Sequence, residues 1–223
     1  MSIAERWAEV KTRVDRACEQ AGRSPAEVTL VAVSKTHPAE SVREAAAAGA
    51  TDFGENYAQE LADKRVALPD VRWHYIGRLQ RNKAKLVAGH VALVHAVDSI
   101  ELAQELGKRA GGLVQPILLS VNLAGETTKG GVTAEDALAL APRLATVTGV
   151  RLDGLMTMPP PADDPEVSAP VFDGLRQLRD RIADATGQPL PVLSMGMSGD
   201  FEVAIRCGAT HVRIGTAIFG SRG

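Results

Sequence analysis

The sequence predicts an α/β fold, a (β/α)8 TIM barrel with an extra helix at its N-terminal end. Short apolar runs rich in β-branched residues alternate with Ala- and Leu-rich stretches that carry charged faces. At 223 residues and 45% hydrophobic composition, the chain is long enough to bury one substantial core. An open, doubly wound sheet is the alternative, because periodicity alone does not report whether a sheet closes.

The N-terminal helix is predicted by Ile3, Trp7 and Val10, which recur at helical spacing after Ser2, a capping residue, and Gly22 ends it. The predicted strands are residues 30–34, 52–54, 73–76, 93–97, 116–121, 154–156, 192–194 and 212–214. The predicted helices between them are residues 39–48, 58–67, 83–87, 100–109, 134–146, 169–186 and 201–207. No segment divides the chain, since the proline-rich stretch at 159–165 is best interpreted as a stiff surface loop. We therefore expect a single domain over residues 1–223.

Composition argues against several classes of partner. A formal net charge of -2 and an aromatic content of 4% predict no nucleic-acid surface. No apolar stretch approaches the length that spans a membrane, and the first residues lack the apolar centre of a signal peptide. We expect a cytoplasmic protein with no membrane contact.

The cysteines and histidines do not predict a metal site. Cys18 and Cys207 have no ligand spacing and are expected to be free thiols. His90 and His95 flank a predicted strand, and the opposite ends of one strand are a poor place for two ligands of the same metal.

Lys35 follows the first predicted strand and is a candidate nucleophile. A lysine carried out of a hydrophobic core is partly desolvated, which favours a neutral amine that can attack an aldehyde. Taken alone, it is better explained as a strand-end lysine whose stem packs on the core while its ammonium reaches water.

Two loops near the end of the chain predict a phosphate site. Ser198, after the seventh predicted strand, is expected to cap the next helix, and Gly199 lets backbone amides approach an anion. Capping without a ligand explains this loop equally well. After the eighth predicted strand, Arg213 brings a fixed charge, and Gly215 and Thr216 offer backbone donors and a hydroxyl. The alternative for Arg213 is a structural ion pair with a carboxylate.

In a closed barrel the first and eighth strands are neighbours, so Lys35 meets these two loops. An aldehyde-reactive amine beside a site for one terminal phosphate suggests pyridoxal 5'-phosphate, which carries both partners on one ring. A class I aldolase-like enzyme, in which Lys35 attacks a sugar-phosphate carbonyl directly, would use the same lysine and loops.

Six motifs in a fixed order carry a resemblance to a known family. They are Val33-Ser34-Lys35-Thr36, Phe53-Gly54-Glu55-Asn56, the segment from His74 to Lys83, Gly154-Leu155-Met156-Thr157-Met158, the segment from Ser194 to Asp200, and the segment from Val212 to Gly220. The sequence resembles the pyridoxal phosphate homeostasis protein family, also called the YggS/PROSC family. The resemblance implies a barrel similar to the N-terminal domain of alanine racemase.

The same resemblance assigns roles to individual residues. Lys35 is expected to hold pyridoxal 5'-phosphate as a Schiff base, and Arg213 is expected to face the pyridine nitrogen. A permanent cation there discourages protonation of the ring and weakens it as an electron sink. The remaining cofactor-binding residues, four for the phosphate and two for the ring, are Ser198, Gly199, Gly215 and Thr216, then Asn56 and Met158.

Three residues near the expected site keep open roles. His74 ends the third predicted strand, where a ligand contact and a satisfied structural histidine are equally plausible. Lys83 closes a basic turn and is either part of the site or solvated. Lys129, in a loop after the fifth strand, is interpreted as an exposed lysine rather than a phosphate contact.

The competing functions are a cofactor carrier and an amino-acid racemase. Two-base racemisation needs a second acid or base opposite Lys35, which alanine racemases take from a tyrosine in a second domain of the partner subunit. The chain ends soon after the eighth predicted strand, so we expect no such domain, and Tyr57 is interpreted as a packing residue. We therefore predict a monomeric protein that buffers or delivers pyridoxal 5'-phosphate inside the cell, with apo-forms of pyridoxal phosphate-dependent enzymes as partners, and not an enzyme.

Overall fold

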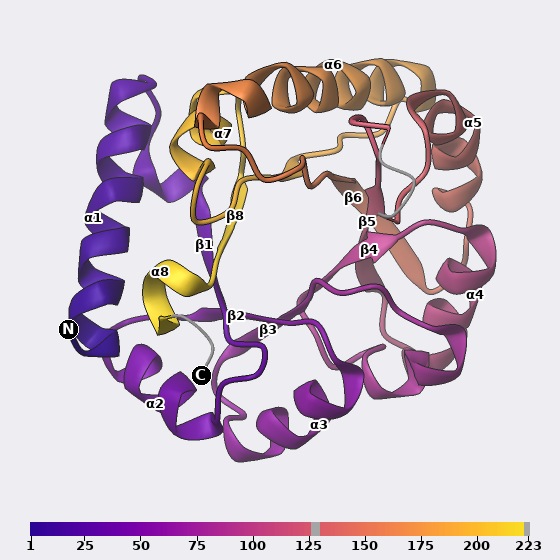
Figure 1. Cartoon of the computed structure of the whole chain (residues 1–223). Coiled ribbons are helices and arrows are strands. Elements are labelled where there is room, and N and C mark those ends of the chain that lie inside the picture. The colour runs from indigo at the N-terminus through magenta and orange to yellow at the C-terminus, as the bar shows by residue number, and fades with distance from the viewer. Residues whose placement is uncertain (126–129, 221–223) are drawn as a thin grey trace.

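The computed structural model describes residues 1–125 and 130–220. Eight parallel strands close into a barrel in sequence order, with the eighth strand paired to the first, as Figure 1 shows in a view along the barrel. The strands are β1 (Thr29–Val33), β2 (Asp52–Glu55), β3 (Arg72–Tyr75), β4 (Leu93–Val97), β5 (Gln115–Ser120), β6 (Val150–Met156), β7 (Val192–Ser194) and β8 (His211–Ile214). The predicted barrel is confirmed, and the open sheet is excluded.

Helices cover the outside of the barrel (Figure 1). They are α1 (Ile3–Gln20), α2 (Ala39–Ala47), α3 (Ala58–Ala67), α4 (Ile100–Arg109), α5 (Ala134–Leu144), α6 (Ala169–Thr186), α7 (Phe201–Arg206) and α8 (Thr216–Phe219). The predicted extra helix is α1, which packs against α2, α7 and α8. Its start is fixed by a capping box, in which Ser2 Oγ accepts from the Glu5 amide and the Glu5 carboxylate accepts from the Ser2 amide.

Three elements differ from the sequence prediction by more than small shifts of their ends. The helix expected over residues 83–87 is a 3-10 helix, η2 (Arg81–Leu86). The sixth strand begins at Val150 and not at Gly154. The sequence prediction misses its first residues because the exposed Arg151 and the partly exposed Asp153 interrupt the apolar pattern without ending the strand. The short helix α8, which begins directly after Gly215, was not predicted, because four residues are too few to show a helical period.

The protein has two buried regions, one outside the strands and one inside the barrel. Large apolar side chains such as Phe53, Phe172 and Phe201 are fully buried in the main hydrophobic core. Hydrogen bonds between side chains of non-adjacent strands, such as His95 on β4 and Ser194 on β7, show that polar groups occupy the barrel interior. The interior of such barrels is more often filled by branched apolar residues. No helix in the described part of the chain is long and apolar enough to cross a lipid bilayer.

Candidate functional site

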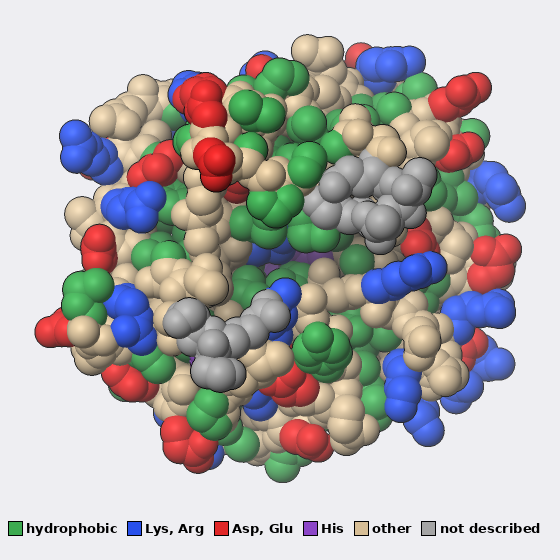
Figure 2. All heavy atoms as spheres, in the orientation of Figure 1, with side chains coloured by type: hydrophobic (Ala, Val, Ile, Leu, Met, Phe, Trp, Pro, Cys, Tyr) green, Lys and Arg blue, Asp and Glu red, His purple; other side chains and the backbone are tan. Residues whose placement is uncertain are grey.

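All eight predicted cofactor residues line one pocket of about 400 Å³. They are Lys35, Asn56, Met158, Ser198, Gly199, Arg213, Gly215 and Thr216. Arg213 lies near the end of β8 and the other seven follow barrel strands, so the pocket lies at the carboxyl ends of the strands, where barrel active sites are found. Figure 2 shows a hollow near the centre of this face, with basic and histidine side chains on its floor.

Lys35 lies in the tight turn that follows β1, since the strand ends at Val33 and not at residue 34 as predicted. The next residue, Thr36, has φ +66°, the only positive φ of a non-glycine residue in the described chain. A β-branched residue rarely adopts this conformation, and such strain collects at functional sites. The Thr36 amide donates to Glu60 Oε1 at 2.7 Å, which helps to hold the turn.

A buried lysine fixes the other side of the same turn. Lys64 Nζ on α3 donates to the Ser34 carbonyl at 2.7 Å, to Glu55 Oε1 at 2.7 Å and to Glu60 Oε1 at 2.6 Å. Ser34 Oγ also donates to Glu55 Oε1, at 2.6 Å. Burial raises the pKa of Glu55 although Lys64 and Ser34 oppose the shift. Both residues that flank Lys35 are thus tied to one ionic cluster beneath it.

The phosphate end of the pocket brings the two predicted loops together. Thr216 Oγ1 donates to Ser198 Oγ at 3.3 Å, so both hydroxyls face the same space. A Cβ at Gly199 would meet no atom within 4 Å, which leaves the backbone of this loop open to a ligand. Gly215 is more confined, because a Cβ there would lie 3.3 Å from the Val33 carbonyl.

The expected helix cap at Ser198 is wrong. The residue before α7 is Asp200, and its Oδ1 accepts from the Met197 amide at 2.7 Å, which closes the loop on itself. Ser198 stands two residues earlier and points to Thr216 instead of capping the helix. The glycine that this loop requires is Gly196, which has φ +92°.

Arg213 is nearly buried, with 5% of its surface exposed, and its guanidinium is held by two acceptors. Nη1 donates to Ser194 Oγ at 2.5 Å, and Nη2 donates to the Thr157 carbonyl at 3.0 Å. No carboxylate of the described residues forms an ion pair with it, so the alternative of a structural ion pair is wrong. Burial lowers the pKa of Arg213 to about 10, which leaves the group charged at neutral pH.

The predicted ring contacts differ in exposure. Asn56 follows β2, and its Oδ1 is buried with no hydrogen-bond partner in the described chain. A buried acceptor of this kind is normally satisfied, so a ligand donor fits this position. Met158 is 43% exposed and lines the pocket after β6. The lysine, the two hydroxyls, the buried cation and the unsatisfied amide oxygen together fit a phosphorylated pyridine aldehyde.

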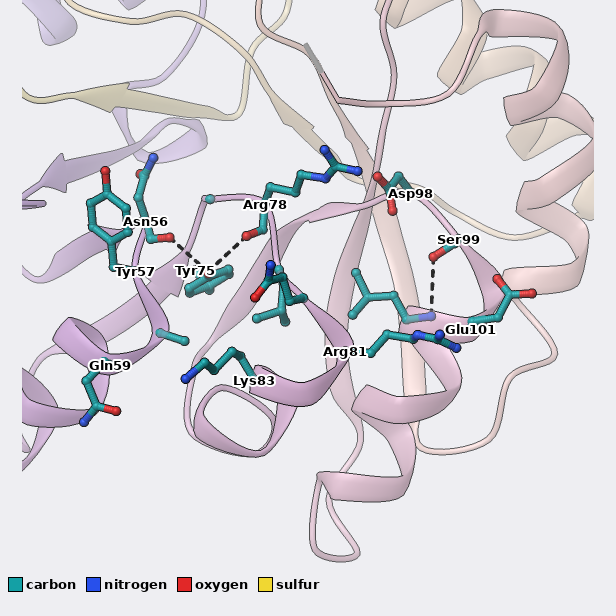
Figure 3. A pocket seen from close by; sticks show the side chains of 15 residues that line it. Asn56, Tyr57, Gln59, Tyr75, Arg78, Arg81, Lys83, Asp98, Ser99 and Glu101 are labelled. Atoms are coloured by element: carbon teal, nitrogen blue, oxygen red, sulfur yellow. Dashed lines mark hydrogen bonds between the residues drawn. The ribbon is translucent and has the colours of Figure 1, made fainter. Parts of the chain in front are cut away.

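A wider pocket of about 980 Å³ adjoins the first and shares Asn56, Gly77 and Arg78 with it. Figure 3 shows Asn56 and Tyr57 on one side of it, Asp98 and Glu101 on the other, and Arg78, Arg81 and Lys83 between them. Lys83 therefore lines this wider pocket and not the cofactor pocket. Tyr57 is 56% exposed here, so its interpretation as a packing residue is wrong. The tyrosine that packs is Tyr75, which is buried and donates to the Asn56 carbonyl at 2.9 Å.

Sequence reasoning missed two charged or titratable residues of the cofactor pocket. His37 lines it two residues after Lys35 and stacks on Phe219 with 5.2 Å between ring centroids. Its proximity to Lys35 in the sequence was the available signal. Arg78 also lines the pocket, and the basic turn from Gly77 to Lys83 pointed to it only as a group.

His74 is a structural histidine and does not line either pocket. Its ring lies in the barrel interior, 3.0 Å from Asp52 through Nε2 and 3.0 Å from His95 through Nδ1. Lys129 lies outside the described residues. The described residues contain no group of three or more His, Cys, Asp or Glu side chains arranged to hold a metal, and Cys18 and Cys207 are buried free thiols.

Comparisons with known proteins identify the family of this chain. The family model for the alanine racemase N-terminal domain matches residues 8–223. A pyridoxal phosphate homeostasis protein of Aquifex aeolicus (strain VF5) is 46% identical over 226 residues, which cover 100% of this chain and 99% of that protein. The chain belongs to the pyridoxal phosphate homeostasis protein family. Another member, from Escherichia coli (strain K12), is 40% identical over 99% of this chain and 97% of its own length.

Two solved structures resemble this chain in fold. PipY of Synechococcus elongatus PCC7942, solved with pyridoxal phosphate bound, superposes with a TM-score of 0.86 at 36% identity, covering 98% of this chain and 100% of PipY. Alanine racemase of Corynebacterium glutamicum gives a TM-score of 0.74 at 20% identity, covering 98% of this chain but 62% of the racemase. The second likeness concerns the barrel fold alone.

Proposed function

We propose that this member of the pyridoxal phosphate homeostasis protein family binds pyridoxal 5'-phosphate, holds it as a Schiff base on Lys35, and buffers or delivers it inside the cell. The observation that carries the proposal is the convergence of Lys35 with the Ser198 and Thr216 loops on one pocket. The binding of pyridoxal phosphate by PipY, which shares the fold over the whole chain, supports the choice of cofactor.

Different residues of the pocket would bind different parts of the cofactor. Lys35 would supply the amine that condenses with the aldehyde carbon, with loss of one water molecule. Hydroxyls of Ser198 and Thr216, with the amides beside Gly199 and Gly215, suit the phosphate. Arg213 can only donate hydrogen bonds and stays charged, so it would hold the ring nitrogen without giving it a proton.

A carrier fits the pocket better than the alternative racemase. The described residues that line the pocket include no tyrosine, aspartate or glutamate that could act as a second acid or base opposite Lys35. His37 is the one imidazole among them, and it lies on the same turn as Lys35. Racemisation by two bases needs groups on opposite faces of the ring.

Borohydride reduction of the purified protein, followed by intact mass and peptide mapping, tests the covalent link. We expect pyridoxyl label on Lys35, and none in Lys35→Ala. The matched control is Lys83→Ala, which removes a lysine from the adjoining pocket and should leave the label in place. A colourless protein that takes up no added cofactor would favour the aldolase-like alternative.

Two further measurements address the role. Incubation of the loaded protein with single-enantiomer amino acids should give no sustained racemisation, whereas turnover would overturn the carrier assignment. Mixing the loaded protein with an apo-form of a pyridoxal phosphate-dependent enzyme, in the presence of a scavenger for free cofactor, should restore activity if delivery is direct. Equilibrium sedimentation checks the proposed monomer.

A further inference from the structure

A chain of hydrogen bonds crosses the barrel interior and ends at Arg213. Asp52 Oδ1 lies 3.0 Å from His74 Nε2, His74 Nδ1 lies 3.0 Å from His95 Nε2, and His95 Nδ1 lies 2.8 Å from Ser194 Oγ. Ser194 Oγ in turn accepts from Arg213 Nη1 at 2.5 Å. The five residues come from β2, β3, β4, β7 and β8, and all are buried.

The two ends of this hydrogen-bond chain limit where its protons can lie. The Arg213 guanidinium can only donate, so Ser194 Oγ must accept from it, and the Ser194 proton is then available for His95 Nδ1. An ionised Asp52 can only accept, so His74 carries a proton on Nε2, and His95 with its own proton on Nε2 donates to His74 Nδ1. Every donor then points away from the pocket and toward Asp52.

The charges around the chain agree with this arrangement. Burial would raise the pKa of Asp52, but hydrogen bonds from His74, Arg72 and Thr51 outweigh it and hold the pKa well below its ordinary value. Burial holds the pKa of His95 well below its ordinary value, so this imidazole is neutral. Asp52 is therefore an anion, and the chain joins it to a buried cation through a neutral imidazole.

The residues next to these five side chains do not compete for the protons of the hydrogen-bond chain. His211 on β8 packs against the rings of both His74 and His95, at 5.9 and 6.0 Å between centroids, and burial lowers the pKa of His211 to about 3. Its Nδ1 interacts with Thr210 Oγ1 at 3.1 Å. On the far side of Asp52, Arg72 Nη2 donates to Oδ2 at 2.7 Å. No other carboxylate of the described chain lies within hydrogen-bond distance of these five side chains.

We propose that Ser194 and His95, aligned by His74 and Asp52, are positioning residues that orient Arg213 toward the cofactor pocket. Ser194 takes one N–H group and the Thr157 carbonyl takes another, which fixes the guanidinium plane and leaves its remaining N–H groups for the pocket. The proposal deepens the proposed function and rests on it for the identity of the ligand.

The proton positions are tested in the cofactor-free protein. Nitrogen-15 NMR of the histidine side chains at pH 7 should show His95 as a neutral imidazole protonated on Nε2, with Nδ1 unprotonated. Asp52→Asn, which touches neither pocket, should change the His74 signal. A proton on Nδ1 of His95 in the unmodified protein would overturn the proposal, whatever the protein binds.

The effect on Arg213 is tested with pyridoxal 5'-phosphate as the probe. Ser194→Ala should weaken binding by about tenfold, the loss expected for one hydrogen bond to a charged group, and should shift the absorption band of the bound cofactor. Ser120→Ala, another buried serine at the end of a barrel strand, is the matched control and should change neither. Binding and spectrum unchanged in Ser194→Ala would refute the positioning role, whereas absence of label on Lys35 in the unmodified protein would refute the proposed function alone.

Discussion

Lys64 Nζ lies 2.7 Å from Glu55 Oε1 in a buried ion pair directly beneath the turn that carries Lys35. The same ammonium donates to the carbonyl of Ser34, the residue before Lys35. Glu60, which shares Lys64, accepts from the amide of Thr36, the residue after it. Lys35, the proposed nucleophile, is therefore placed by a second lysine that does not line the cofactor pocket.

Lys64→Met should destabilise the protein strongly. The substitution leaves Glu55 buried without its cation, and breaking a buried pair in this way costs about 3–5 kcal/mol. Urea denaturation monitored by circular dichroism measures the change in the free energy of unfolding. The control is Lys11→Met, which removes an exposed i,i+4 pair with Asp15 and should change stability by less than about 0.5 kcal/mol. Equal effects of the two substitutions would show that the cluster does not hold the turn.

Thr36→Gly should stabilise the fold while it loosens the site. Glycine adopts φ +66° without strain, and a non-glycine residue in that region costs about 1–3 kcal/mol, which more than offsets the entropy lost by glycine. We expect an increase of about 1 kcal/mol in the free energy of unfolding, with weaker binding of pyridoxal 5'-phosphate. Thr36→Ala keeps the strain and is the control. If Thr36→Gly is less stable than Thr36→Ala, the turn is not strained.

The residues of the pocket could be predicted from the sequence, whereas the residues that support them could not. Lys35, Arg213 and the two loops were predictable because strand order in a closed barrel brings the first and eighth strands together. The Lys64 cluster was not, because a lysine in a charged helix is typical of a solvated face. His74 was undecidable for a similar reason, since its partner His95 belongs to a different strand, and one sequence does not report which side chains meet inside a barrel.

Stability should fall as the pH decreases from about 6 to about 4. His95 has a pKa far below its ordinary value in the folded state, so the unfolded chain binds a proton that the folded chain does not. One such group lowers the free energy of unfolding by about 1.4 kcal/mol for each pH unit below its pKa in the unfolded chain. The raised pKa of Glu55 acts in the opposite direction, so the test is a comparison. His95→Gln should have a shallower slope of unfolding free energy against pH, and an unchanged slope would mean that His95 is protonated in the fold.

Two glycines of one loop should respond differently to alanine. Gly196 has φ +92°, and a Cβ there would lie 2.6 Å from Ala204 Cβ, so Gly196→Ala must strain the backbone and displace the start of α7. A Cβ at Gly199 would have open space around it, with no atom within 4 Å, so Gly199→Ala should fold normally.

The two substitutions therefore separate support of the phosphate loop from contact with its ligand. Thermal unfolding should show a loss of several degrees for Gly196→Ala and less than about one degree for Gly199→Ala, because the first stores strain of about 1–3 kcal/mol. Titration with inorganic phosphate and with pyridoxal 5'-phosphate should then show weaker binding in Gly199→Ala, since a methyl group would occupy the space that the amides leave for an anion. Undiminished binding in a folded Gly199→Ala protein would place the phosphate elsewhere in the pocket, because only a ligand that approaches this backbone closely is sensitive to one added carbon.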